Sequence, residues 1–156
     1  MGGSMFYVGK KAITKKFNFS NVIGKEDLPG YIRHYIHEDE TILVAYKTER
    51  DHATFTDKKV VLFDNYSRFG MRKQIYSISY KSISAVAITF EKTKAEMNII
   101  LDNGYHVYLR FADVLPEDKV RLRILYTCIN RISSNQEPLK EDIKRLLDNN
   151  FKIKNK

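Results

Sequence analysis

The residue types of a serine–lysine catalytic dyad occur in one stretch of the chain, YSISYKSI at residues 76–83. Such a dyad needs a serine hydroxyl within hydrogen-bond reach of an uncharged lysine, and donors that stabilise an oxyanion. Ser79 and Lys81 are two positions apart and would share one face of a strand. However, Lys81 falls at a predicted strand end, where solvent keeps an ammonium charged, and no glycine-rich turn surrounds the serines. We therefore expect Ser77, Ser79 and Ser82 to bond backbone groups at a bend between strands.

A second candidate for chemistry is a pair of histidines three positions apart. His34 and His37 would lie on one side of a helix, and two such ligands can begin a zinc site. The other histidines are distant in the sequence, and there is one cysteine, Cys128, within a helical pattern. We expect exposed or partly packed histidines and a core cysteine. Because no nucleophile–base pair, metal-ligand set or phosphate-binding loop is visible, the sequence predicts neither an enzyme nor a cofactor.

Basic residues form two further candidate sites. One is an anion- or partner-binding patch of basic and aromatic residues: Lys58, Lys59, Arg68, Phe69, Arg72 and Lys73. Such mixtures can bind nucleic acid or anionic lipid, although lysines at strand edges also prevent unwanted pairing. The other is an N-terminal segment without acidic residues that carries Lys10, Lys11, Lys15 and Lys16.

The charge of the chain is concentrated at its two ends. Among 156 residues, 43% are apolar and 29% are charged, which is ordinary for one globular domain, and the net charge is +8. Residues 5–24 contribute +4 and residues 150–156 contribute +3, so the middle of the chain is nearly neutral. A neutral domain argues against a built-in nucleic-acid face. The basic ends could contact a membrane, a nucleic acid or an acidic partner, or could simply keep the protein in solution.

The sequence carries no sign of secretion or of a membrane span. No apolar run approaches the roughly 18 residues that a spanning helix needs, and the first residues lack the apolar core of a signal peptide. A Gly-Gly-Ser followed by a second methionine is typical of a vector junction, so residues 1–4 are interpreted as a leader. Without a disulfide framework, we expect a cytoplasmic protein that contacts a membrane at most peripherally.

Strand patterns dominate the middle of the chain. Residues 5–24 show no clear period, and a helix is then predicted from four apolar residues with helical spacing: Leu28, Ile32, Tyr35 and Ile36. Seven short strands follow at 41–48, 52–56, 58–64, 71–80, 84–91 and in the two halves of 96–111. Asn103-Gly104 predicts a two-residue type I′ turn between the last two strands, since both central positions of that turn need a positive φ.

Two helices are expected after the strands. Pro116 and the two acids after it begin a helix whose apolar stripe runs from Val120 to Ile132. Pro138 begins the last helix, whose apolar residues keep helical spacing: Leu139, Ile143, Leu146, Leu147 and Phe151. The sequence thus predicts a basic segment at 1–24, a domain at 25–134, and a C-terminal amphipathic helix with a basic tail at 135–156.

Several of these segments resemble the bacterial pleckstrin-homology-like domain family over about residues 26–132. RDHATFTDKKVVLFD at 50–64 is similar to the family's Arg-Asp, Phe-Thr-x-Lys-Lys and apolar strand that ends in Asp. Gly70 with Arg72-Lys73 resembles its Gly-Lys-Lys, and HEDETILVAYK at 37–47 its acidic lead-in. YSISYKSI resembles its Tyr-x-Ser-Ile-Pro-Tyr-x-Ser-Ile run, with Ser79 where the family usually has proline.

The resemblance implies a mainly β fold: a PH-like, seven-stranded antiparallel barrel or sandwich capped by a C-terminal helix, here with extra N- and C-terminal helices. It also implies a binding or scaffolding module without known catalysis, often assembled into ring-like homo-oligomers. Typical members of the wider superfamily bind phosphoinositides through basic residues near the first loop. Here that loop, TERD at 48–51, holds two acids, so no lipid motif carries over.

The expected function is therefore a non-enzymatic module that self-assembles into a homo-oligomer and presents a surface to a protein partner. A small barrel needs one capping helix, and the further apolar stripes must be buried against the barrel, each other or a neighbouring subunit. The predicted interface comprises Leu28, Ile32, Tyr35, Ile36, Leu139, Ile143, Leu146 and Leu147. Two alternatives are peripheral binding to an anionic membrane through the basic ends and nucleic-acid binding through the basic tails. No small-molecule substrate is expected.

Overall fold

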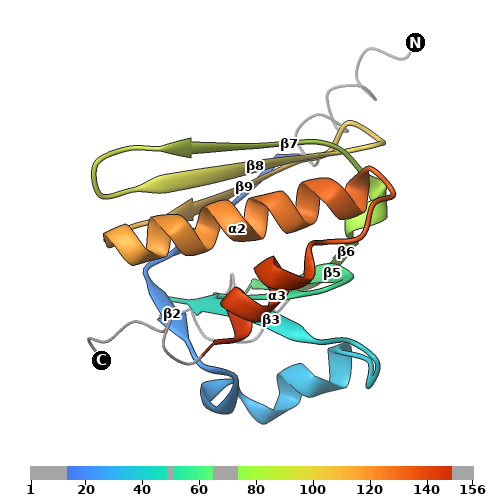
Figure 1. Ribbon diagram of the computed structural model, residues 1–156, viewed down its shortest axis with the longest axis horizontal. Coiled ribbons are helices and arrows are strands. Elements are labelled where there is room, and N and C mark those ends of the chain that lie inside the picture. The colour runs from blue at the N-terminus through green and yellow to red at the C-terminus, as the bar shows by residue number, and fades with distance from the viewer. Residues whose placement is uncertain (1–13, 49–50, 65–73, 149–156) are drawn as a thin grey trace.

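The computed structural model of the protein describes residues 14–48, 51–64 and 74–148 (Figure 1). Within these residues nine strands form a four-stranded sheet, ordered β1-β9-β8-β7, and a five-stranded sheet, ordered β2-β3-β4-β5-β6. The strands are β1 (Thr14–Phe19), β2 (Asn21–Ile23), β3 (Ile42–Lys47), β4 (His52–Thr56), β5 (Lys59–Asp64), β6 (Gln74–Ser79), β7 (Ile83–Phe90), β8 (Ala95–Leu101) and β9 (His106–Phe111). The predicted mainly β fold is confirmed, and the seven predicted strands are β3 to β9.

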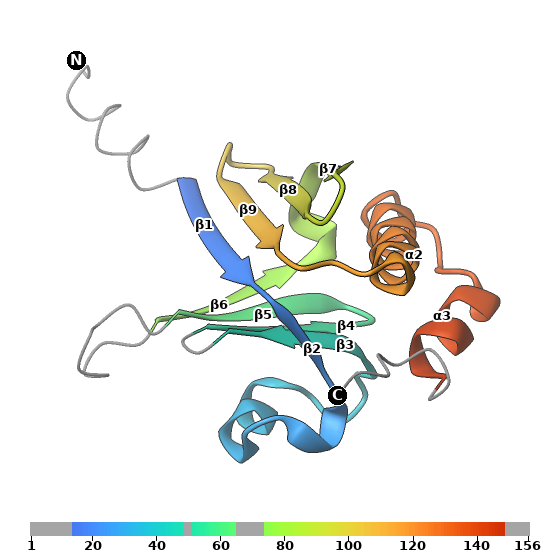
Figure 2. The ribbon, with the colours of Figure 1, turned by 90° about the vertical axis from the view of Figure 1, so that its left-hand side faces the viewer.

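The two sheets pack as a sandwich and do not close into a barrel. Strands β6 and β7 are not paired with each other and are joined by a short 3-10 helix, η3 (Tyr80–Ser82). Helix α2 (Pro116–Ser133) lies along this open side and packs against β7 and η3 (Figure 2). Its apolar stripe enters the core between the sheets, where Leu122, Leu125 and Ile129 are fully buried. The predicted capping helix therefore covers the side that strand pairing leaves open.

Residues 14–23 form two strands, although the sequence shows no clear period there. β1 pairs in parallel with β9 and β2 pairs antiparallel with β3, so this one segment passes from the first sheet to the second (Figure 2). Phe17 and Phe19 are each 1% exposed and lie in the main core. Because the chain changes sheets at Ser20, each run of alternating apolar and polar residues is short, and the strand periodicity cannot be recognised in the sequence.

The predicted N-terminal helix is replaced by two short 3-10 helices, η1 (Lys25–Asp27) and η2 (Gly30–Tyr35). Pro29 and Gly30 interrupt the segment, and both residues disfavour a continuous α-helix. Leu28 and Ile32 nevertheless turn to one side and are buried against the outer face of the five-stranded sheet. There they form a second, smaller core with Ile42, Ala45, Val61 and Phe63. This packing buries β5 on both faces.

The hairpin between β8 and β9 is confirmed, but the predicted type I′ turn is wrong. Gly104 has a φ of 88°, whereas Asn103 does not take a positive φ. The Leu101 carbonyl accepts a hydrogen bond from the Gly104 N–H at 2.8 Å, and the Leu101 N–H donates to the Tyr105 carbonyl at 2.8 Å. These bonds define a three-residue loop with glycine at its last position. The Asn103 side chain accepts a hydrogen bond from the Tyr105 N–H at 3.0 Å and supports the loop.

The last helix, α3 (Lys140–Leu147), packs against α2 and β3. Asn135 follows α2 with a φ of 64°, a left-handed conformation that ends helices. The Arg131 Nε donates to the Glu137 carbonyl at 2.7 Å, which fixes the connection between the two helices. None of the helices in the described ranges has the length and apolar character needed to cross a membrane.

Candidate functional site

The serine-rich stretch at 76–83 forms a bend that is stabilised by its own hydroxyl groups. The Ser79 Oγ accepts a hydrogen bond from the Lys81 N–H at 3.2 Å, and the Ser82 Oγ donates to the Ser79 carbonyl at 2.7 Å. Tyr80 is fully buried and its hydroxyl donates to the Thr56 carbonyl at 2.7 Å. The backbone role predicted for Ser79 and Ser82 is confirmed, while Ser77 is exposed on β6.

The histidines do not come together. His34 and His37 are both exposed. Across residues 14–48, 51–64 and 74–148, no cluster of three or more His, Cys, Asp or Glu side chains could hold a metal ion. Cys128 is buried as predicted. Burial, with a contribution from the Asp142 carboxylate and against that of Arg131, raises the pKa of the Cys128 thiol to about 11.

The predicted basic patch is only partly described. The Lys59 Nζ lies 3.3 Å from the Glu40 Oε2 in a nearly buried ion pair, so Lys59 is engaged within the domain. Lys58 is exposed at the turn between β4 and β5. Outside the described residues lie Arg68, Phe69, Arg72 and Lys73, and also Lys10 and Lys11 of the N-terminal segment. Lys15 and Lys16 belong to β1, and the Lys16 side chain is exposed.

The N-terminal half of the predicted interface is largely used within the chain. Leu28 and Ile32 are buried in the smaller core, and Ile36 is half-buried against it. Tyr35 is 42% exposed and its ring meets the Phe63 ring edge-on at 5.7 Å between centroids. Burial against the chain's own sheet was one of the expected ways to cover this stripe.

The C-terminal half of the predicted interface is covered only in part. Leu146 is 7% exposed and joins the main core, and Ile143 packs against that core while remaining half-buried. Leu139 and Leu147 are 48% and 39% exposed. One helix thus has a docked side that holds Leu146 and a neighbouring side that still shows apolar surface.

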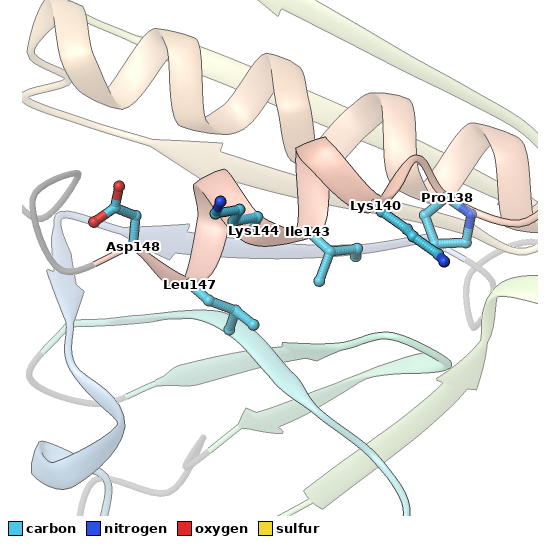
Figure 3. Close-up of a pocket in the computed structure, with 6 residues that line it drawn as sticks. All are labelled: Pro138, Lys140, Ile143, Lys144, Leu147 and Asp148. Carbon is cyan, nitrogen blue, oxygen red and sulfur yellow. The ribbon is translucent and has the colours of Figure 1, made fainter.

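This neighbouring side forms a groove, called the α3 groove below, of about 620 Å³. Its lining residues are Pro138, Lys140, Ile143, Lys144, Leu147 and Asp148 (Figure 3). Ile143 and Leu147, four positions apart, point to the same side of the helix (Figure 3). Lys140 and Lys144 border them, so an apolar surface has a basic rim, with one carboxylate at the end of the helix.

A buried ion pair near the start of α2 helps to hold the helix that supports α3. The Arg121 Nη1 lies 2.6 Å from the Asp118 Oδ1, and both side chains are almost fully buried. The Asp118 Oδ2 also accepts a hydrogen bond from the Leu115 N–H at 3.2 Å, which caps the helix. Burial raises the pKa of the neighbouring Tyr46 hydroxyl well above its usual range, with Arg121 acting in the opposite direction. These contacts fix the first turn of α2.

Sequence reasoning found the apolar part of the α3 groove and missed its rim. Ile143 and Leu147 were identified by helical spacing, which also selected Leu139, outside the lining, and the buried Leu146. Pro138, Lys140, Lys144 and Asp148 were not identified. A signal was present, because Lys140 and Lys144 follow the same four-residue spacing as the apolar pair and lie beside it on a helix.

The comparisons with known proteins agree on one kind of domain. A family model described as "Bacterial PH domain" matches residues 12–113. An uncharacterized protein, YjqA of Bacillus subtilis (strain 168), is 37% identical over 57 residues, which are 36% of this chain and 46% of that protein. The chain thus spans less than half the length of this curated relative.

Two solved structures share the fold. A PH-domain-containing bacterial protein from Exiguobacterium sibiricum 255-15 matches with a TM-score of 0.57 and 19% identity, over 76% of this chain and 63% of that chain. A DUF1696 family protein with a pleckstrin-homology domain from Shewanella loihica PV-4 matches with a TM-score of 0.58 and 20% identity, over 73% of this chain and 98% of that chain. The matched residues 12–113 contain β1 to β9 but neither α2 nor α3, so the α3 groove lies outside them.

Proposed function

This chain belongs to the bacterial PH domain family, and from that premise we propose that it is a non-enzymatic binding and scaffolding module that self-assembles into a homo-oligomer. The assembled protein presents a surface to a protein partner. PH-like domains commonly serve as binding modules. The observation that supports self-assembly is the α3 groove, which leaves apolar surface uncovered on a helix that is otherwise docked.

The α3 groove has the composition of a protein contact. Single exposed apolar residues are ordinary on protein surfaces, but contiguous apolar surface bordered by charge marks interaction sites. Here Leu139, which precedes α3 as its N-cap residue, and Leu147, its last residue, are 48% and 39% exposed. The groove residue Ile143 lies between them in the sequence. Covering these side chains would remove apolar area from water, which is the main favourable term in association.

The ends of the groove are compatible with a second copy of the chain as its occupant. Lys140 begins α3 and Asp148 directly follows it. When two α3 helices pack antiparallel about a two-fold axis, Lys140 of each copy faces Asp148 of the other, whereas Lys144, midway between them, faces Lys144 of the other copy, so burial of the apolar side chains has to supply the affinity. A ring-like assembly, which the family resemblance implies, would need a second and different contact.

The test is the solution mass by light scattering after size exclusion, measured for the full chain over a range of concentrations. A contact between two short helices is smaller than a standard interface of about 1,600 Å², so we expect a mass that rises with concentration to a discrete multiple of 18.3 kDa. The variant Leu139→Glu/Leu147→Glu should remain a monomer, because it would bury four carboxylates in the contact.

Leu115→Glu is the matched control, since Leu115 is 39% exposed, as is Leu147, but lies at the start of α2. This variant should keep the mass of the wild type. A monomeric wild-type chain at all concentrations would refute self-assembly. An oligomer that survives the double substitution would refute the α3 groove as its interface.

A second candidate function is peripheral binding to an anionic membrane, and the basic rim of the α3 groove favours it. Amphipathic helices with lysines beside an apolar face lie in the membrane interface. Each lysine near an anionic surface contributes about 1 kcal/mol, so Lys140 and Lys144 would assist the basic ends of the chain. Flotation with phosphatidylserine-containing vesicles tests this function, and no binding at low salt would reject it.

Nucleic-acid binding through the tails stays a prediction from the sequence, because of the lysines at the two ends of the chain only Lys15 and Lys16, in β1, lie within the described residues. It requires an electrophoretic shift at low salt that disappears steeply as salt is added. A cytoplasmic location likewise stays a prediction.

A further inference from the structure

Strand β7 is an edge strand whose own sequence lacks the usual protection against pairing, and α2 packs beside it. It ends the four-stranded sheet, and its eight residues, ISAVAITF, include no charged residue and no proline. Edge strands usually carry lysine, proline or a bulge that prevents another strand from adding to them. The opposite edge strand, β1, has Lys15 and Lys16. The irregularity in the pairing of β7 is confined to Ile83–Ala85, so the remainder presents a regular edge.

The register shows which backbone groups of β7 point away from the sheet. The Glu91 N–H donates to the Lys94 carbonyl at 2.8 Å, so the backbone groups of Glu91, directly after β7, point toward the β8 side. Bonded and non-bonded pairs alternate along an antiparallel ladder. The N–H and C=O groups of Phe90, Ile88 and Val86 therefore point outward, where no strand of the described residues pairs with them.

The same three residues carry a strip of apolar side chains that the core covers incompletely. Val86, Ile88 and Phe90, called the β7 strip below, pair with Ile99, Met97 and Ala95 of β8. Those β8 side chains are at most 4% exposed, whereas Val86 and Ile88 are half-buried and Phe90 is 38% exposed. Burial thus decreases from β8 to the edge. A strand added to β7 would cover this strip.

Helix α2 lies beside the β7 strip and is basic on that side. Lys119, Arg123 and Tyr126 have the spacing i, i+4 and i+7, which places them on one side of the helix. α3 packs on the other side, where Arg131 bonds the Glu137 carbonyl. β7 and α3 accordingly lie on opposite sides of α2 in both views (Figures 1 and 2).

Acidic residues are absent from this side of α2, which the structure describes in full. Its two acids are Glu117, which lies two positions before Lys119 and so on a different side of the helix, and Asp118, which is buried against Arg121. Lys119 is half-buried and Arg123 is exposed. The free edge of β7 is therefore bordered by positive charge on its α2 side, and Glu91 is an exposed acid at the end of the strand.

We propose that the edge of β7 binds an extended acidic segment of a partner protein, which adds to the four-stranded sheet as a further strand. Main-chain bonds to Val86, Ile88 and Phe90 would hold the segment, and its apolar side chains at alternate positions would cover the β7 strip. Its carboxylates would lie near Lys119 and Arg123. This site is separate from the α3 groove, so it does not depend on self-assembly.

Charge decides against a second copy of β7 as the added strand. Pairing of two β7 edges would bring two α2 helices to the same seam, with Lys119 and Arg123 of both copies close together. Like charges across an interface oppose association. An acidic segment removes this repulsion and gains attraction instead.

The probes are two synthetic nine-residue peptides, one that alternates valine with glutamate and one that alternates valine with lysine. Affinity for the full chain is measured by fluorescence anisotropy, and backbone amide exchange of β7 by NMR with and without peptide. The same measurements on Leu139→Glu/Leu147→Glu separate this site from self-assembly. A glutamate peptide with a central proline is the control for strand addition.

We expect the glutamate peptide to bind about tenfold more tightly than the lysine peptide, the ratio for roughly 1.4 kcal/mol. Amides of Val86, Ile88 and Phe90 should become protected on binding, and the proline peptide should not protect them. Arg123→Glu should reduce or reverse the preference between the peptides. The double variant of α3 should bind as the wild type does.

Three results would overturn the proposal. The first is no binding of either peptide, and the second is binding without protection of the three β7 amides. The third is concentration-dependent protection of these amides in the chain alone, because a second copy would then occupy the edge.

Discussion

His52, at the start of β4, is a half-buried histidine in a largely apolar setting. Its ring meets the Phe63 ring edge-on, with 6.4 Å between centroids. Its Nδ1 is buried and has no hydrogen-bond partner within the described part of the chain. Burial lowers the pKa of His52 from 6.5, Lys47 lowers it further, and Asp51 acts in the opposite direction. The folded chain therefore binds a proton here less readily than the unfolded chain.

Stability should consequently fall as the pH drops below about 6.5. A lowered pKa in the folded state means that the unfolded state takes up the proton first, so the contribution of neutral His52 is fully present above 6.5 and is lost through the interval down to the folded-state pKa. Urea unfolding from pH 8 to pH 5 measures this slope. His52→Phe should flatten it, whereas substitution of the exposed His34 by Gln should not. An unchanged slope in His52→Phe would contradict the assignment.

The thiol of Cys128 should be nearly unreactive in the folded protein. Its pKa is about 11, against 9.0 for an unburied thiol, so at pH 8 it carries about one hundredth of the thiolate that an unburied thiol carries. Burial also blocks access of the reagent to the sulfur. The rate of reaction with a chromogenic disulfide, with and without denaturing urea, checks this. Fast reaction of the native chain would show that α2 opens readily.

Strands and helices could be predicted from the sequence where one apolar periodicity continued along a segment that stays in one sheet or packs on one surface. β3 to β9 each keep a single sheet and were all found. β1 and β2 were not, because the chain changes sheets at Ser20 and joins β9 in parallel, a pairing with no local signal. The 3-10 form of η2 was also missed, since Leu28 and Ile32 satisfy helical spacing in either kind of helix. The Gly104 turn depended on loop length, which Asn103-Gly104 alone does not fix.

Leu146 should anchor α3 in the core, whereas the adjacent Leu147 should be available for contacts with other molecules. Leu146 is 7% exposed in the core, and Leu147 is 39% exposed. Leu146→Ala should lower the free energy of unfolding by about 2–4 kcal/mol, because it leaves a cavity, whereas Leu147→Ala should change it by about 0.5 kcal/mol or less. Urea denaturation below the concentration of self-association compares them. Equal losses would mean that α3 does not dock as the structure shows.

The candidate site depends on the whole molecule more than on any motif. The sequence identified α3 as an amphipathic helix, but only packing shows that Leu146 faces inward and Leu147 outward. It placed β7 correctly, yet its position at a sheet edge comes from the strand order, which no local pattern encodes. For the same reason the interface predicted at Leu28 and Ile32 could not be distinguished from a second core. Local periods determine which side of an element is apolar, and topology determines what covers it.

Residues 14–23 should be essential to the domain, because they join its two sheets. Phe17 and Phe19 are each 1% exposed; Phe17 meets Tyr76 of β6 at 5.9 Å and Phe19 meets Phe111 of β9 at 5.7 Å between ring centroids. Loss of one buried phenylalanine costs about 3–5 kcal/mol, so loss of two approaches the total stability of about 5–15 kcal/mol. Residues 25–156 alone should therefore be unfolded by circular dichroism and amide NMR. Residues 12–156 keep both strands and should unfold cooperatively as the full chain does. A folded 25–156 fragment with an unchanged urea midpoint would show that β1 and β2 are accessory to a core that begins at β3.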